Sequence, residues 1–235
     1  MIMDASPGML EGDRYEFDWE AEEGAHLSLT NQGFTKVHPG SPEKGSSMAS
    51  RFLLAPNACI ENMMKPIMLY KDASFENETT VNLGVGAVWM QGEVLCPGRT
   101  ARGESFLYRK LDNRLKVYYE GELIHYQRQR ILPEAQQIYS IGAWENHSHI
   151  GTFHVFSDKV TPDLLVKIRN ALEEAPSRTD CPAYAGAALT YRHGIAVTAA
   201  SSSAWILQEW LQLIREIVRG DLLEPLPLLW SNGLL

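Results

Sequence analysis

The residues with the clearest chemical potential lie between two strands expected near the middle of the chain. A short stretch there combines two glycines, two arginines and two glutamates, which are Gly98, Gly103, Arg99, Arg102, Glu93 and Glu104. Glycine accepts a positive φ without steric cost, so the stretch can turn sharply. Arginine presents a planar fork that binds a carboxylate through two hydrogen bonds. The pattern predicts a corner in which Glu93 and Glu104 hold Arg99 and Arg102. A charged docking or ion-handling site is the alternative.

Three histidines offer a second kind of chemistry. His147, His149 and His154 lie within eight residues of one another. On a strand, His147 and His149 would project from the same face, which is a workable geometry for imidazole ligands to a metal ion. The residues around them are equally typical of a polar loop, and a closed metal site needs further ligands. A metal-dependent enzyme that uses these histidines is therefore one alternative function.

The composition and the missing motifs argue against several classes of protein. The net charge of −8 disfavours nucleic-acid binding, which needs a basic surface. The sequence holds no GxxxxGK[ST] loop, no GxSxG elbow and no HExxH motif. Its cysteines, Cys59, Cys96 and Cys181, are too scattered to indicate a disulfide framework or a zinc ribbon. No secretory signal and no apolar run of about 18 residues is present, so we expect a cytoplasmic protein without a membrane partner.

Most of the chain is predicted to form short strands. Period-two alternation and turn residues place them at 26–30, 51–54, 59–63, 74–83, 87–95, 105–111, 115–119, 123–131 and 152–156. A hairpin turn is expected at 120–122. The sequence shows no repeat of fixed period. Strands this close together favour stacked sheets, a sandwich or a β-solenoid over βαβ units.

Two helices are predicted near the C-terminus. Thr161 is a favourable N-cap with Pro162 at the first helical position, and Pro176 is expected to end the first helix. The second helix follows Ser203, carries a broad apolar stripe and is expected to stop at Gly220. The width of this stripe suits burial against a sheet.

An acidic run lies near the start of the chain. Its carboxylates are Glu11, Asp13, Glu16, Asp18, Glu20, Glu22 and Glu23, and Arg14 is the only cation among them. Such a run is typical of a solvated strand edge, where like charges discourage pairing with another sheet. A cation-attracting surface is the alternative.

Several motifs, taken in order, resemble one protein family. The central stretch has the pattern Glu, Gly-Arg, Arg-Gly-Glu-x-Phe, and it is preceded by a Gly-Asp motif, a Thr-x-Gln-x-x-Thr-Lys-Val-like segment and an Ile-Glu step. The matching positions are Gly12, Asp13, Gln32, Thr35, Lys36, Glu61, Pro66, Glu93, Gly98, Arg99, Arg102, Gly103 and Glu104. This set is similar to that of the UreD (UreH) family of urease accessory proteins, most clearly over residues 7–132.

The resemblance implies a fold and a function. The fold is mostly β with two C-terminal α-helices, in a stacked-sheet or β-helix-like arrangement. One domain would cover residues 1–235 and lack the N-terminal strands that family members carry before the Gly-Asp motif. The implied function is not enzymatic. It is a scaffold that links apo-urease to UreF and the GTPase UreG for nickel delivery, with no permanently bound cofactor and with nickel as a transient ligand.

The carboxylates in the matching motifs are the candidates for passing nickel. They are Asp13, Glu61, Glu93 and Glu104. An internal path lined by oxygen ligands can pass an ion if each binding step is weak. The alternative for each carboxylate is a buried ion pair with a basic residue such as Arg99, Arg102 or Lys36. A general β-sandwich binding module without metal is a further alternative function.

Overall fold

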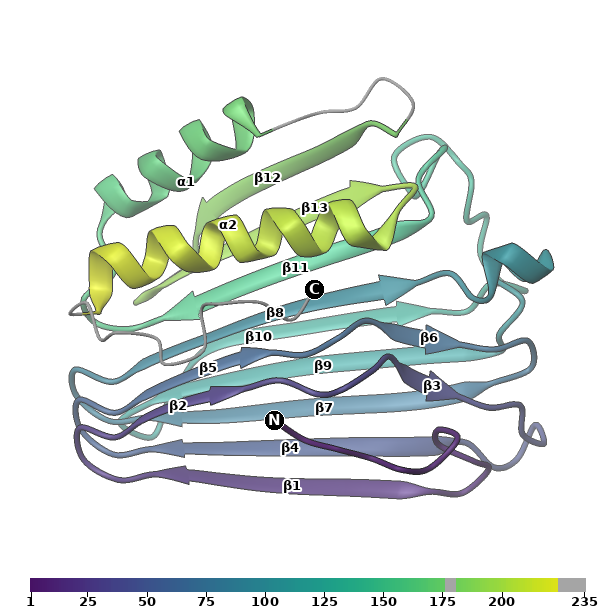
Figure 1. Ribbon diagram of the computed structural model, residues 1–235, viewed down its shortest axis with the longest axis horizontal. Coiled ribbons are helices and arrows are strands. Elements are labelled where there is room, and N and C mark those ends of the chain that lie inside the picture. The colour runs from purple at the N-terminus through teal and green to yellow at the C-terminus, as the bar shows by residue number, and fades with distance from the viewer. Residues whose placement is uncertain (176–180, 224–235) are drawn as a thin grey trace.

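The computed structural model describes residues 1–175 and 181–223, and in this part of the chain two sheets face each other beneath two helices (Figure 1). The five-stranded sheet has the order β1 (Arg14–Ala21), β4 (Ser46–Leu54), β7 (Ser74–Leu83), β9 (Lys110–Tyr119) and β10 (Glu122–Ile131). The eight-stranded sheet has the order β12 (Ala183–Leu189), β13 (Gly194–Ser201), β11 (His149–Phe156), β8 (Val88–Cys96), β5 (Cys59–Met63) and β2 (His26–Leu29). The short strands β3 (Thr35–Val37) and β6 (Ile67–Leu69) continue its edge, with β6 paired to β8.

The chain passes alternately through the two sheets and forms a solenoid-like stack of about three coils. The strands β1, β4, β7 and β9 pair in parallel in one sheet, and β2, β5 and β8 pair in parallel in the other. The strands of the first set begin at Arg14, Ser46, Ser74 and Lys110, so successive coils differ in length. This inequality explains why the sequence shows no fixed repeat. The expectation of a mostly β, β-helix-like fold with two helices is confirmed.

The helices α1 (Pro162–Glu174) and α2 (Ala204–Leu222) cover the outer face of the eight-stranded sheet (Figure 1). Thr161 caps α1, because its hydroxyl accepts a hydrogen bond of 3.3 Å from the backbone N–H of Leu164. The predicted stop at Pro176 lies outside the described residues. None of the described helices has the length and apolar character that a membrane span needs.

The predicted stop of the second helix at Gly220 is wrong, because α2 continues to Leu222. Glycine inside a helix costs about 1 kcal/mol relative to alanine. Val218 and Arg219 are buried at this end of α2, so tertiary contacts outweigh that local cost.

A second correction concerns the strand predicted at 105–111. The ladder begins only at Lys110, and the preceding residues form a loop. Phe106 has a φ of 54°, which no strand residue adopts, and its buried ring packs against Tyr139 and Trp144. The hairpin predicted at 120–122 is confirmed, with positive φ angles of 47° at Glu120 and 82° at Gly121.

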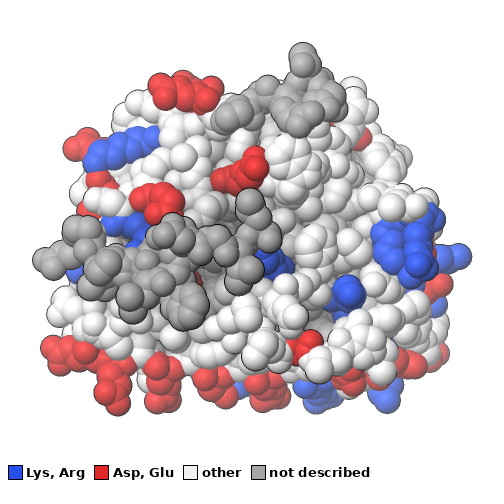
Figure 2. Space-filling view, viewed as in Figure 1, with Lys and Arg blue, Asp and Glu red and all other residues white. Residues whose placement is uncertain are grey.

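The acidic run lies along the free edge strand β1, as its pattern predicts. Glu16, Asp18 and Glu20 are exposed, and Figure 2 shows a row of carboxylates along the corresponding lower rim. Arg51 on β4 is the cation nearest to them, 3.2 Å from Asp18 and 3.8 Å from Glu16. Like charges along an unpaired strand discourage association with another sheet edge.

Apolar side chains of the described residues form three clusters. One fills the space between the helices and the eight-stranded sheet. The other two lie between the sheets, one around Trp89 and the other around Phe75. Polar residues at the inward positions of β7 and β8 lie between these two apolar clusters and separate them. The order is Phe75, Asn77, Thr79 and Val81 on β7, and Trp89, Gln91, Glu93 and Leu95 on β8.

Candidate functional site

A layer of polar side chains crosses the space between the sheets. We call it the polar belt, and its members are Asn62, Asn77, Thr79, Gln91, Glu93, Asn113, Gln127, Thr152 and His154. Strand register produces it, because β7 places Asn77 beside Asn113 of β9, and β11 places Thr152 beside Glu93 of β8. Neighbouring strands thus present polar residues at the same level of the stack.

Hydrogen bonds connect much of the belt. Asn62 donates to Gln91 over 2.7 Å, and Asn77 donates to Asn113 over 3.0 Å. The amide oxygens of Asn62 and Asn77 are buried and have no hydrogen-bond partner among the described residues. A buried acceptor without a partner costs free energy, so the belt presents oxygen atoms suited to a ligand or a cation.

Glu93 is the carboxylate of the belt, and the described residues that donate hydrogen bonds to it are neutral. It accepts hydrogen bonds from Asn113 and, over 3.3 Å, from Asn77. No ion pair joins Glu93 to a basic side chain within residues 1–175 and 181–223. Burial raises the pKa of Glu93 to about 7, and the hydrogen bond from Asn113 opposes that rise. Near neutral pH this carboxyl can therefore take up or release a proton, or exchange the proton for a cation.

Two cavities meet at the belt. A wide cavity of about 440 Å³ reaches from the N-terminal segment and the aromatic side of β1 to the belt. A small one of about 20 Å³ lies between the belt and the strands β10 and β11. Thr79, Gln91 and Glu93 line both cavities. Glu93 therefore lies at the junction of the two spaces, partly accessible from the wide one.

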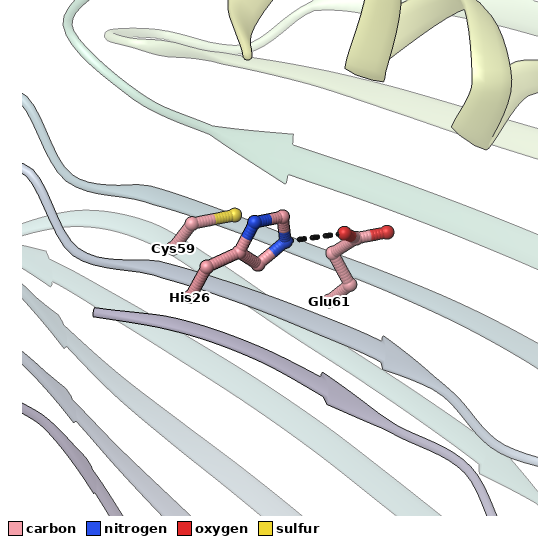
Figure 3. A group of neighbouring side chains, drawn as sticks. All are labelled: His26, Cys59 and Glu61. Atoms are coloured by element: carbon pink, nitrogen blue, oxygen red, sulfur yellow. Dashed lines mark hydrogen bonds and ion pairs between the residues drawn. The ribbon is translucent and has the colours of Figure 1, made fainter. Parts of the chain in front are cut away.

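Glu61 occupies the opposite face of the same sheet. It lies beneath α2 and accepts hydrogen bonds from Arg215 over 2.5 Å, from Arg219, and from His26 over 2.5 Å (Figure 3). Burial alone would raise the pKa of Glu61, but the hydrogen bonds from His26 and Arg215 and the charges of both arginines outweigh burial and lower it. Glu61 is a buried, paired carboxylate, as the alternative for the motif glutamates predicted, although its partners are other arginines.

The glycine-punctuated stretch forms the predicted corner only in part. Arg99 binds Glu104 through two hydrogen bonds, one of them 2.8 Å long, and its guanidinium lies 4.1 Å from the ring centre of Tyr70. Gly98 has a φ of 141°, and a Cβ there would lie 2.7 Å from the backbone oxygen of Glu104. The prediction that Glu93 also holds the arginines is wrong, because β8 directs Glu93 into the belt.

The remaining corner residues are exposed. Arg102 lies in the short 3-10 helix η1 (Thr100–Arg102) and has no ion pair with Glu93 or Glu104 in the described chain. Gly103 follows with a φ of 74° and ends this turn. These residues shape the corner and take no part in the interior.

The upstream motif residues hold the first coil together. Asp13 accepts a 2.7 Å hydrogen bond from the backbone of Leu10, in a turn where Gly12 has a φ of 80°. The backbone of Thr35 donates to the carbonyl of Pro66 over 3.0 Å. Gln32, Thr35 and Lys36 line the wide cavity. The structure thus separates the four candidate carboxylates: Glu93 lines both of the cavities described above, whereas Asp13, Glu61 and Glu104 line neither of these two.

The three candidate histidines do not form a joint site. His149 and His154 project from opposite faces of β11, and His147 precedes the strand. Burial lowers the pKa of His149 to about 4 and that of His154 to about 3. His154 donates to Gln127 over 2.7 Å as part of the belt. The alternative of a metal site shared by the three histidines therefore does not fit the structure, because a spacing of five residues on a strand places two side chains on opposite faces.

Sequence reasoning missed most of the belt and the partners of Glu61. Asn77 and Thr79 occupy the inward positions between Phe75 and Val81 on one strand, which was the available signal for a polar interior. Arg215 and Arg219 lie four residues apart on the second helix, a spacing that places them on one face.

The fold and the site together define a β-solenoid protein with a polar, carboxylate-bearing interior. The family model described as UreD urease accessory protein matches residues 1–231, so the chain belongs to this family. Urease accessory protein UreD of Acetivibrio thermocellus is 29% identical over 222 residues, which are 93% of this chain and 81% of that protein. The protein of the same name from Staphylococcus aureus strain RF122 is 28% identical over 221 residues, which are 94% of this chain and 78% of that protein.

Proposed function

We propose that this chain is a non-catalytic scaffold for urease maturation in the cytoplasm, linking apo-urease to UreF and, through UreF, to the GTPase UreG. Nickel is the cargo of this assembly. Membership of the UreD family supports the role in urease maturation. The absence of a P-loop from the sequence fits a division of labour in which another protein hydrolyses the nucleotide.

The observation that carries the nickel role is the junction at Glu93. A carboxylate that has no cationic partner among the described residues, placed where two cavities meet, is poorly explained by fold stability alone. A divalent cation supplies the missing charge, and the unpartnered amide oxygens of Asn62 and Asn77 offer further ligands.

Weak binding is a requirement for delivery. Neutral amides and a single carboxylate bind a divalent ion less tightly than a closed set of thiolates and imidazoles. The proton that Glu93 holds near neutral pH leaves as the ion arrives and returns as the ion departs. The belt therefore suits passage of an ion more than storage.

Co-expression tests the scaffold role. The chain, produced with UreF, UreG and apo-urease, is expected to co-purify with UreF and with urease, and urease activity is expected to require the chain. Failure of the soluble, folded chain to co-purify with either partner would refute the proposal. Glu78→Gln, on the outer face of β7 and far from the interior, removes one carboxylate charge; it serves as the control and should leave assembly unchanged.

A further inference from the structure

A compact group of possible metal ligands lies on the helix-covered face, away from the belt. The Sγ of Cys59, one ring nitrogen of His26 and one carboxylate oxygen of Glu61 all lie within 4.8 Å of one another. The register of β2 and β5 produces this group, because His26 is paired with Cys59 and Glu61 follows two positions later on the same face. Figure 3 shows the sulfur beside the ring nitrogen that faces away from Glu61.

The hydrogen bond to Glu61 decides which nitrogen of His26 carries the proton. The carboxylate can only accept, since its two arginine partners keep it ionised, so Nε2–H of His26 donates to it. In the neutral ring, Nδ1 then holds a lone pair on the side of Cys59. Metal-binding histidines commonly donate their second N–H to a carboxylate in this way, which fixes the ring and raises its basicity.

We propose that Cys59 Sγ and His26 Nδ1 bind a borderline divalent transition-metal ion, with Glu61 as the positioning residue for the imidazole. Metal–sulfur bonds of about 2.3 Å and metal–nitrogen bonds of about 2.0–2.1 Å allow the two ligand atoms to lie at most about 4.4 Å apart, and the ligand atoms of this group lie no more than 4.8 Å from one another, so small side-chain adjustments suffice. Water or a partner's side chain completes the coordination.

The surroundings favour a reversible site. Binding releases the thiol proton of the buried Cys59, and this release opposes tight binding. Arg215 and Arg219 add positive charge near the ion, although both are bound to Glu61. The side chain of His26 is 18% exposed, which gives an ion access past the edge strand β2. These features lower affinity and allow release.

The choice of nickel rests on the proposed function, whereas the site itself rests on the geometry.

The full chain, freed of metal, is titrated with Ni²⁺ while calorimetry measures affinity and absorption spectroscopy records the thiolate-to-nickel band. We expect one band-forming site in the unmodified chain. Cys59→Ser should abolish the band and weaken binding by at least about 100-fold. Cys96→Ser is the matched control, because Cys96 is equally buried and should leave the band intact.

His26→Gln gives an independent check at a partly exposed position, and glutamine keeps an N–H group that can donate to Glu61. It should also weaken Ni²⁺ binding and change the band. Absence of the band from the unmodified chain, or its persistence in Cys59→Ser, would overturn the site. Failure of the proposed function gives a different result from failure of this site. The chain would then still bind nickel but would not co-purify with UreF.

Discussion

Glu61 and Glu93 lie on neighbouring strands of one sheet but face opposite surroundings. Glu61 lies under α2 with two arginines and a histidine, and its pKa is lowered. Glu93 lies between the sheets with two asparagines, and its pKa is raised to about 7. Arginines compensate the charge of Glu61, which joins α2 to the sheet. In the described part of the chain, no cation compensates the charge of Glu93 at the cavity junction.

The difference teaches how to assign roles to buried carboxylates. A carboxylate with ionised partners on another element fixes that element, and its removal leaves the partners unpaired. A carboxylate with only neutral donors lowers stability when it ionises, so its presence needs a functional reason. In this protein the first description fits Glu61 and the second fits Glu93.

The largest expected effect is that of Glu61→Gln. The change leaves Arg215 and Arg219 beneath α2 without their carboxylate, and breaking a buried ion pair typically costs about 3–5 kcal/mol. Urea unfolding at neutral pH measures the free energy of unfolding. The control Glu78→Gln should change it by less than about 1 kcal/mol. A loss below about 1 kcal/mol in Glu61→Gln would contradict the structural role.

Glu93→Gln should have the opposite sign and a smaller size. Between pH 4.5 and about 7 the folded chain holds the Glu93 proton more tightly than the unfolded chain, so stability falls as pH rises. Glutamine does not ionise, so this contribution disappears. We expect the variant to be more stable than the unmodified chain by roughly 1–3 kcal/mol at pH 8, with the difference vanishing below pH 4.5.

Unfolding curves recorded from pH 4 to pH 8 check this prediction. A difference between Glu93→Gln and the unmodified chain that does not change with pH would show that Glu93 has an ordinary pKa. The contrast drawn between the pKa values of Glu61 and Glu93 would then be wrong for Glu93.

The smallest expected effect is that of Asn113→Ala. Asn113 donates to Glu93 and so favours the ionised form. Its removal should move the titration of Glu93 to still higher pH. Carboxyl ¹³C chemical shifts measure the change, and Gln129→Ala, on the opposing strand, is the control. A downward movement would contradict the account, because the hydrogen bond from Asn113 would then not favour the ionised form.

Local signals in the sequence predicted much of the fold. The Thr161 cap, the hairpin at Glu120 and the acidic edge strand all depend on residues close in the chain, and the structure confirms each. The Arg99–Glu104 pair of the corner spans five residues and was predicted for the same reason. Local propensity misled at Phe106 and Gly220, where tertiary packing determines the backbone.

The candidate site was less predictable. Glu61 meets Arg215 and Arg219 across 154 and 158 residues, a distance that no local pattern encodes. The strand β8 is buried on both faces, so its sequence lacks the alternation that would place Glu93 on one side. The resemblance identified both glutamates as candidates, but only the stacking of the coils separates their surroundings.

The measurement that tests the account most directly is the nickel content of urease matured with Glu93→Gln. The variant should fold, co-purify with UreF and urease as the unmodified chain does, and yet leave urease with much less nickel and activity. Glu78→Gln should support normal loading. Full nickel loading by Glu93→Gln would contradict the claim that the uncompensated carboxylate at the cavity junction serves the passage of the ion.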